Sequence, residues 1–252
     1  MIRKLVNRLG YDVVKYPNRR GFEYHLSRLF DFLRIDTVLD VGANHGQYAA
    51  SLREFGYNGW IYSYEPVKSV FDSLSERMTG DQFWRGFNFA LGETEDRKRI
   101  NVAAGDAQAS SFLPFNSDGP ERWGEAHTVA RVEEVEVHRL ESVMADITRE
   151  RPDARIYLKL DTQGLDLPVL RSAGDRIPLI LGLQSEIAAH HFYEGMLPFG
   201  DAISAYLELG FEITGIFPLS KEFDQLRVIE FDFVFMRTSL SSHSSASTPV
   251  AR

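Results

Sequence analysis

The segment from Val38 to Tyr48, VLDVGANHGQY, constrains the fold more than any other part of this chain. Its apolar run ends around Asp40, crosses a turn with Gly42 and Gly46, and opens a helical pattern. A strand that ends in a glycine turn and continues as a helix places backbone N–H groups and a helix N-terminus in one crevice. Asn44 stands where a G-x-G-x-x-G dinucleotide fingerprint needs glycine, and no Gly-Lys-Ser/Thr of a phosphate loop follows. The pattern therefore favours a ligand with hydroxyls and positive charge over pyrophosphate.

A second acidic strand end follows at the spacing expected for a nucleotide-like ligand. The run Trp60 to Tyr64 is predicted to be a buried strand, and it ends at Glu65 and Pro66, with Glu65 19 residues after Gly46. At roughly 20 residues, an acidic side chain closes the second strand and binds ribose hydroxyls. S-adenosylmethionine has ribose hydroxyls, an ammonium group and a sulfonium group, so it fits both motifs. The alternatives are a tight strand–helix turn and an exposed strand-end charge.

Composition indicates an ordinary enzyme. The chain has 252 residues, 44% of them hydrophobic, which is enough for a sizeable core. A net charge of −8 argues against a general nucleic-acid binder. The absence of cysteine excludes disulfides, thiolate metal sites and cysteine nucleophiles. No apolar run approaches the ~20 residues of a membrane span, and signal-peptide features are missing, so we expect a cytoplasmic protein.

Helical and strand patterns alternate along the chain, which predicts a parallel sheet covered by helices. Helices are predicted over Phe22–Leu33, Tyr48–Phe55, Val67–Met78, Leu140–Ile147 and Asp201–Leu209. Strands are predicted over Thr37–Val41, Trp60–Tyr64, Gln82–Phe89, Arg99–Ala103, Val129–Val137, Arg155–Leu160, Ile177–Leu183, Phe211–Phe217 and Val228–Met236. We expect an N-terminal helical segment over residues 1–35, one domain over 36–237 and a disordered Ser-rich tail over 238–252.

Two regions have more than one interpretation. The stretch from Gly105 to Thr128 is long and contains aromatic residues, so it is predicted to be a lid over substrate, with an ordinary disordered insert as the alternative. In the N-terminal segment, apolar residues repeat at Ile2, Leu5, Val6 and Leu9 among several lysines and arginines. Such a helix would touch a membrane surface or, more simply, pack on the domain.

Acidic residues fall at the predicted carboxyl ends of four different strands: Asp40, Glu65, Asp161 and Glu186. In an open α/β sheet, ligands bind beyond these strand ends, so we expect the four carboxylates to converge on one crevice. A carboxylate or histidine near an acceptor hydroxyl would take its proton during transfer chemistry. Structural roles are the alternatives: a helix cap or a partner that orients Lys159 for Asp161, an ion pair for Glu186, and a position at the surface or behind the site for His190 and His191.

With these segments in view, the chain resembles the FkbM family of S-adenosylmethionine-dependent O-methyltransferases, from about Val38 to about Met236. The segments that match are VLDVGANHGQYAASL, IYSYEP, ALG at Ala90–Gly92, SSFL at Ser110–Leu113, YLKLDTQGLDLPVL at Tyr157–Leu170, LQSEI at Leu183–Ile187, and EFDFVFMR. The resemblance implies a Rossmann-like class I methyltransferase fold, with a seven-stranded, mostly parallel, doubly wound sheet and helices on both faces. One departure is Asp166, where the family usually has glutamate.

The resemblance implies methylation of a hydroxyl on a sugar of a glycolipid or polysaccharide, or on a secondary metabolite. Alternatives are an N- or carboxyl-methyltransferase on this scaffold, and a non-catalytic protein that binds S-adenosylmethionine and carbohydrate. Asp161, Glu186 and His190 are the candidate catalytic residues. Candidate cofactor ligands are Asp40, Gly42, Asn44, Gly46, Gln47, Glu65, Pro66 and Ala90, and candidate substrate ligands are Ser110, Ser111, Gln163 and His191. Asp161 and Glu186 would supply two oxygens to Mg²⁺, but without a third placed carboxylate a metal is the weaker reading.

Overall fold

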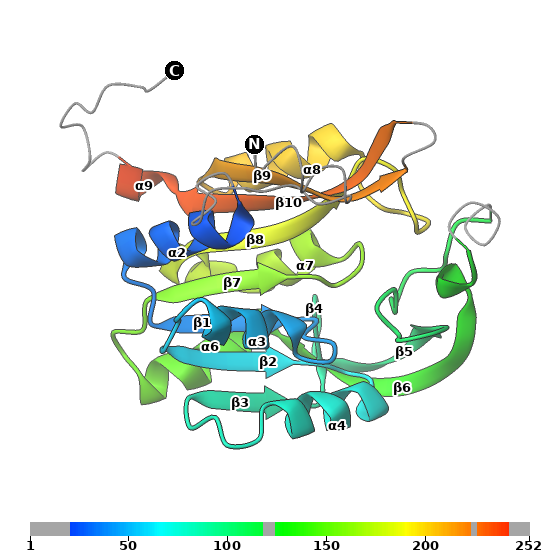
Figure 1. Cartoon of the computed structure of the whole chain (residues 1–252), viewed down its shortest axis with the longest axis horizontal. Coiled ribbons are helices and arrows are strands. Elements are labelled where there is room, and N and C mark those ends of the chain that lie inside the picture. Colours follow the sequence, from blue (N-terminus) through cyan, green and yellow to red (C-terminus); the bar gives the residue numbers. More distant parts are fainter. Residues whose placement is uncertain (1–20, 118–123, 223–225, 242–252) are drawn as a thin grey trace, which may run out of the picture.

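The computed structural model describes residues 21–117, 124–222 and 226–241. Its central feature is a seven-stranded sheet in the order β3-β2-β1-β7-β8-β10-β9 (Figure 1). From one edge to the other, the strands are β3 (Trp84–Phe87), β2 (Trp60–Tyr64), β1 (Thr37–Val41), β7 (Ile156–Leu160), β8 (Ile180–Ala188), β10 (Arg227–Arg237) and β9 (Phe211–Glu222). The first five strands in this order, β3, β2, β1, β7 and β8, pair in parallel. Strand β10 runs antiparallel to both of its neighbours, β8 and β9. The predicted fold class is confirmed.

The central strands are buried on both faces, which is why they read as continuous apolar runs rather than as alternating patterns. Every residue of β1 and of β7 is buried. One face packs against α6 (Leu140–Glu150), α7 (Asp166–Arg171) and α8 (Phe199–Glu208). The other face packs against α2 (Phe22–Leu33), α3 (Gln47–Glu54) and the end of α4 (Lys68–Arg77). The sheet is therefore doubly wound.

A second, three-stranded sheet lies beside the strand ends of the large one (Figure 1). It consists of β4 (Ala90–Gly92), β6 (Val129–Arg139) and β5 (Asp96–Ala103), in that order. Its apolar side packs with Val67 and Val70, around the start of α4. The chain also forms two short 3₁₀ helices in its described part, η1 (Glu125–His127) and η2 (Gly174–Leu179). The sequence predicted strands at β5 and β6 but not the sheet that they form.

Several predicted strands differ in extent from those observed, and two of the differences bear on the site. The single strand expected over Gln82–Phe89 is shorter, and the chain continues into β4 of the other sheet. The strand expected over Ile177–Leu183 starts only at Ile180, after η2, and runs on to Ala188. Glu186 consequently lies inside β8 rather than after it, near the carboxyl end of the strand.

Two helices lie near the ends of the described chain. Helix α2 packs its residues Leu26, Leu29, Phe30 and Leu33 into the same core as the sheet, and the domain boundary at residue 35 stays a prediction. The first four residues of the predicted tail form α9 (Thr238–Ser241). Residues 1–20, with the predicted basic amphipathic stripe, and residues 242–252 lie outside the described residues. No helix within the described ranges has the length and apolar character needed to cross a membrane.

Candidate functional site

A cavity of about 890 Å³ opens at the carboxyl ends of the parallel strands, between the two sheets. The structure brings most of the predicted site residues to its wall: Gly42, Asn44, Gln47, Glu65, Pro66, Ala90, Ser110, Ser111, Asp161, Gln163 and Glu186. It does not bring Asp40, Gly46, His190 or His191 there. The position of the cavity agrees with the general rule for ligand sites in open α/β sheets.

The glycine turn after β1 is shaped by a close backbone approach. Gly42 has φ of 72°, and a Cβ at this position would lie 1.9 Å from the carbonyl oxygen of Asp161. Only glycine therefore lets the loops after β1 and β7 come together. Gly46, with φ of 81°, faces the Leu74 side chain of α4 instead, so it serves helix packing.

Glu65 sits where the sequence placed it, directly after β2, and is only 6% exposed. Its Oε2 accepts a hydrogen bond from the backbone N–H of Asn44 at 3.0 Å, and its Oε1 accepts one from Val67 at 2.9 Å. Each carboxylate oxygen keeps a lone pair for a further donor in the cavity. Burial raises the pKa of Glu65 to about 7. This side chain can accept bonds from vicinal hydroxyls.

The Asn44 side chain organises the turn itself. Its Oδ1 accepts hydrogen bonds from the backbone N–H of His45 at 2.8 Å and from Nε2 of Gln47 at 3.0 Å. Asn44 also has a positive φ of 47°, which asparagine tolerates better than most residues. These contacts fix the loop whose backbone forms one wall of the cavity.

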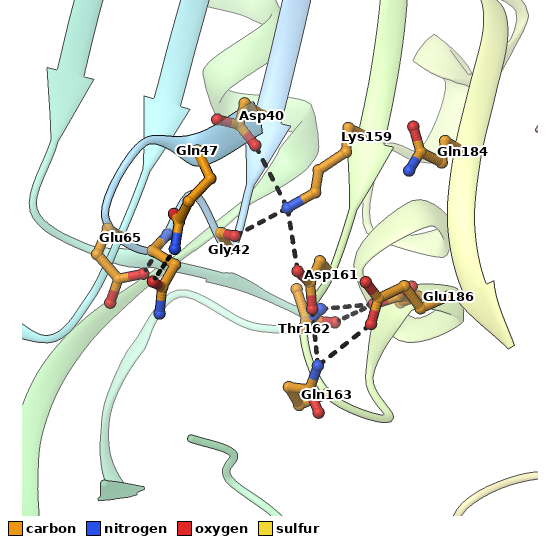
Figure 2. A network of polar contacts seen from close by, with 12 residues as sticks. Asp40, Gly42, Gln47, Glu65, Lys159, Asp161, Thr162, Gln163, Gln184 and Glu186 are labelled. Atoms are coloured by element: carbon orange, nitrogen blue, oxygen red, sulfur yellow. Dashed lines mark hydrogen bonds and ion pairs between the residues drawn. The ribbon is translucent and has the colours of Figure 1, made fainter. Parts of the chain in front are cut away.

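Lys159, which the sequence indicated only as a possible partner of Asp161, lies at the centre of the site (Figure 2). Its Nζ donates to the carbonyl oxygen of Gly42 at 2.9 Å and to Oδ2 of Asp161 at 3.2 Å, and it lies 3.4 Å from Oδ1 of Asp40. Burial alone would lower the pKa of this ammonium, but the neighbouring carboxylates outweigh burial and raise it. Lys159 therefore stays charged and ties the loops after β1 and β7 together.

Asp40 is fully buried beneath this ammonium and does not reach the cavity. Its Oδ2 accepts a hydrogen bond from Oγ of Ser63 at 3.2 Å. Burial raises the pKa of Asp40, while Lys159 acts in the opposite direction. In the structure Asp40 contacts Lys159 and Ser63. The predicted contact between Asp40 and the cofactor stays a prediction.

Asp161, Gln163 and Glu186 form a connected polar group at the cavity wall (Figure 2). Nε2 of Gln163 donates to Oδ1 of Asp161 at 2.8 Å and lies 3.3 Å from Oε2 of Glu186. Gln163 has a positive φ of 52°, so the turn after β7 is held in an uncommon conformation. Burial, followed by repulsion from Asp161, raises the pKa of Glu186 well above its usual range.

Tyr193 is a residue that sequence reasoning missed. Its hydroxyl lies 2.9 Å from Oε1 of Gln163 and 2.8 Å from the carbonyl oxygen of Ala109. It therefore links the turn after β7 to the loop predicted to be a lid. The sequence around Tyr193 does not predict this role, because its contacts join residues that are far apart in the chain.

The two predicted substrate serines have their hydroxyls engaged by the protein. Oγ of Ser110 donates to the carbonyl oxygen of Ala107 at 2.7 Å, and Oγ of Ser111 donates to that of Gln163 at 2.8 Å. A hydroxyl has one hydrogen, and each serine donates it to a backbone carbonyl. The two serines therefore stabilise the loop in this structure. Their predicted contact with substrate would need a lone pair of oxygen rather than the O–H.

The two histidines lie outside the cavity wall. The backbone N–H of His190 donates to Ile229, and the backbone carbonyl of His191 accepts from Nδ2 of Asn116. Glutamate or aspartate at the cavity wall is therefore better placed than His190 to take a proton from an acceptor. His191 remains a predicted substrate ligand without a cavity contact here.

Strands β8 and β10 add polar residues that the sequence analysis did not select. Gln184, Glu230 and Asp232 all line the cavity, and Nε2 of Gln184 donates to Oδ1 of Asp232 at 2.8 Å. Burial raises the pKa of Glu230 to about 7 and that of Asp232 to about 6. The alternation of acidic and apolar residues in β10 signals two different faces, but not that the polar face lines a cavity.

Asp166, the departure from the family pattern, is buried and satisfied by the protein. Its Oδ1 accepts from the backbone N–H and the hydroxyl of Thr162, at 2.7 and 2.6 Å, and its Oδ2 accepts from Ser185 at 2.7 Å. It stabilises the start of α7. Over the described ranges, no three His, Cys, Asp or Glu side chains are arranged so that they could hold a metal ion.

Comparison with known proteins gives a family match and several similar solved structures. The family model of the methyltransferase FkbM domain matches residues 40–213, and no curated protein matches the sequence. Similar solved structures include a putative RNA methyltransferase of Pyrococcus horikoshii, with 15% identity, coverage of 85% of this chain and 81% of that one, and a TM-score of 0.43. Fibrillarin of Aeropyrum pernix with bound S-adenosyl-L-methionine has 14% identity, coverage of 80% and 66%, and a TM-score of 0.41.

A putative S-adenosylmethionine-dependent methyltransferase of Listeria monocytogenes has 9% identity, coverage of 85% and 97%, and a TM-score of 0.45. The family match covers well over half of the chain and includes the glycine turn, Glu65, Lys159 and the Asp161–Glu186 group. This chain belongs to the FkbM methyltransferase family.

Proposed function

We propose that this protein is an S-adenosylmethionine-dependent O-methyltransferase that acts on a hydroxyl of a sugar, in a glycolipid or polysaccharide, or of a secondary metabolite. The observation that carries the proposal is one cavity with Glu65 at the end of β2 and the Asp161–Gln163–Glu186 group across β7 and β8. The first end offers a ribose-binding carboxylate, and the second offers carboxylates beside an acceptor.

The residues at the Glu65 end fit the cofactor. Glu65 is a buried carboxylate at the cavity wall with lone pairs free for two hydroxyl donors. Pro66, Ala90 and Leu91 form an apolar wall beside it, which suits a flat aromatic base. The loop of Gly42 brings backbone to the same wall without a side chain. The site is acidic, as a ligand with ammonium and sulfonium groups requires.

The chemistry at the other end needs a proton acceptor. When bound, S-adenosylmethionine supplies an electrophilic methyl group. Asp161 would orient the acceptor hydroxyl and take its proton at a carboxylate oxygen, with the Lys159 ammonium 3.2 Å from that carboxylate. Glu186, whose pKa is raised by burial and by repulsion from Asp161, would orient the acceptor through its carboxyl group. Gln163 holds the two carboxyl groups in a fixed relation.

Calorimetry tests the cofactor half of the proposal. S-adenosylmethionine and its demethylated product should bind the purified protein and raise its melting temperature, because they bind the native state alone. Glu65→Ala should lose most of this affinity, whereas Glu208→Ala on the exposed end of α8 should keep it. Absent binding to the wild type, or tighter binding of NAD, would contradict the proposal. Transfer of labelled methyl onto a fractionated cell extract would then identify the acceptor.

The predicted membrane contact and cytoplasmic location remain proposals based on sequence. The basic residues of the N-terminal stripe would bring the protein to an anionic surface, where a lipid-linked acceptor would be found. Co-sedimentation with vesicles that contain anionic lipid tests this contact, with neutral vesicles as the control.

A further inference from the structure

We infer that the β8–β10 end of the cavity, formed by Gln184, Glu186, Glu230 and Asp232, binds a cationic amino group of the methyl acceptor. The acceptor is then a hydroxylated amine, such as an amino sugar, rather than a neutral sugar. This inference rests on the proposed function, since it names the substrate class of the same site. The subsite lies across the sheet from Glu65, with β1 and β7 between them.

The first observation is an uncompensated group of carboxyls. Glu186 and Asp232 are register partners on β8 and β10, and Glu230 lies two residues from Asp232, so all three line one cavity. Among the described residues, none of the three makes an ion pair within 4.0 Å, because the Lys159 ammonium is engaged by Asp40 and Asp161. Lys221 also lines the cavity, but it is exposed on β9.

The second observation is an independent acceptor that lacks a donor. Gln184 is 4% exposed and lines the cavity, and its Oε1 has no hydrogen-bond partner in the described residues. The amide orientation is fixed, because Nε2 donates to Asp232 and the reverse orientation would set two acceptors together. A buried acceptor without a donor costs roughly 1–3 kcal/mol. A ligand that donates to Oε1 would remove this cost.

An ammonium group complements such a subsite better than a hydroxyl. It supplies three donors and no acceptor, and it supplies the positive charge that the carboxyls lack. Burial raises the pKa of both Glu230 and Asp232, so a bound cation would also stabilise their ionised forms. An amine held as a cation has no lone pair to attack with. The held amino group therefore positions the acceptor, and a hydroxyl near Asp161 is the methylated atom.

The test uses the full-length protein saturated with S-adenosylhomocysteine, in phosphate buffer. Binding of glucosamine and of glucose is measured by calorimetry and by melting temperature. We expect glucosamine to bind at least about tenfold more tightly than glucose. Glu230→Gln and Asp232→Asn should each remove this preference, whereas Glu208→Gln on α8 should keep it. Both site variants should bind S-adenosylhomocysteine as the wild type does.

Each other outcome has a definite meaning. Equal binding of the two sugars overturns the inference and leaves the proposed function in place. Weaker binding of S-adenosylhomocysteine in both site variants also overturns it, because the carboxyls would then belong to the cofactor site. A wild type that fails to bind S-adenosylhomocysteine overturns the proposed function itself. Should Asp232→Asn fail to fold, Glu230→Gln decides, since Glu230 is less buried than Asp232.

Discussion

Asp161 is the residue on which the proposed chemistry depends most directly. It contacts both Lys159, which belongs to the floor of the site, and Gln163, which joins it to Glu186. Its backbone is as important as its carboxylate, because its carbonyl oxygen lies against Gly42. A substitution that keeps the size of the side chain therefore separates its charge from its place in the loop.

Asp161→Asn should lower turnover by about 10²–10⁴-fold while cofactor affinity changes little, if Asp161 is the proton acceptor. Lys159 keeps its contacts with Asp40 and Gly42 in this variant, so the fold should persist. Single-turnover rates and calorimetry would measure the two effects. Glu186→Gln should lower turnover as well, with non-additive losses in the double variant. His190→Ala, outside the cavity, is the control, and full activity in both carboxamide variants would refute the assignment.

The raised pKa of Glu65 predicts how the free energy of unfolding changes with pH. Burial raises its pKa from 4.5 to about 7 in the folded protein. Between these values the unfolded chain binds fewer protons than the folded one, so the free energy of unfolding falls as pH rises. The loss from this one group is on the order of 3 kcal/mol and is complete above about pH 7.

Glu65→Gln lacks this titration. Its free energy of unfolding, relative to that of the wild type, should therefore rise between about pH 5 and about pH 8. Urea unfolding at both pH values measures the difference, in which the contributions of Glu230 and Asp232 cancel. The same pH slope in both proteins would show that Glu65 is not held protonated. The wild type thus retains a carboxylate that costs stability, which is expected of a ligand-binding residue.

Sequence reasoning found acidic residues where a strand ends, because strand ends are visible in a one-dimensional pattern. It indicated Lys159 only as a partner of Asp161, since a lysine within an apolar run gives no local sign that Asp40 of another strand also neutralises it. It missed Glu230 and Asp232 for a related reason. Their alternation with phenylalanines predicts a polar face, and only the packing of β10 against β8 turns this face into a cavity wall.

At the scale of elements, the loops after β1 and β7 act as one unit. The backbone N–H of Asp161 donates to Val41 at 3.1 Å, and Lys159 joins the same two loops through Gly42. The apolar runs of both strands were predictable, and so was the glycine turn. The three-stranded sheet was not, because Ala90 of β4 pairs with Val137 of β6, far along the chain. Pairing at such separations leaves no local pattern.

Gly42→Ala tests this unit. The new Cβ would overlap the carbonyl oxygen of Asp161, at 1.9 Å, in addition to the cost of a positive φ. Gly56→Ala is the matched control, because Gly56 also has a positive φ of 93° but has no atom within 4 Å of the added Cβ. In the control Gly56→Ala, the free energy of unfolding should fall by about 1–2 kcal/mol. In Gly42→Ala, the free energy of unfolding measured with urea should fall by at least about 2 kcal/mol more than in the control. Equal losses would mean that the loops separate easily.

At the scale of the whole molecule, the cavity lies between two sheets, and the chain forms the small sheet after the first three strands of the large one and before its last four. The large sheet supplies Glu65, Asp161 and Glu186 around the strand ends, and the small sheet supplies Ala90 and Ile100. The segment that follows β5 crosses between them. Its described part, residues 104–117, contacts both sheets: Oγ of Ser111 donates to the Gln163 carbonyl after β7, and the backbone N–H of Ser111 donates to the Asn101 carbonyl of β5 at 3.1 Å.

This arrangement predicts that the segment responds to ligand as a lid. S-adenosylhomocysteine would contact the walls on which the segment rests, so amide hydrogen exchange over residues 106–113 should slow when the ligand is bound. Exchange in β9, at the far edge of the large sheet, should change less. Glu65→Ala, which should not bind, provides the control for effects of added ligand alone. Unchanged exchange in the saturated wild type would make the segment an ordinary loop. Slowing confined to residues 106–113 would show that the cavity closes by local ordering, without movement of the sheets.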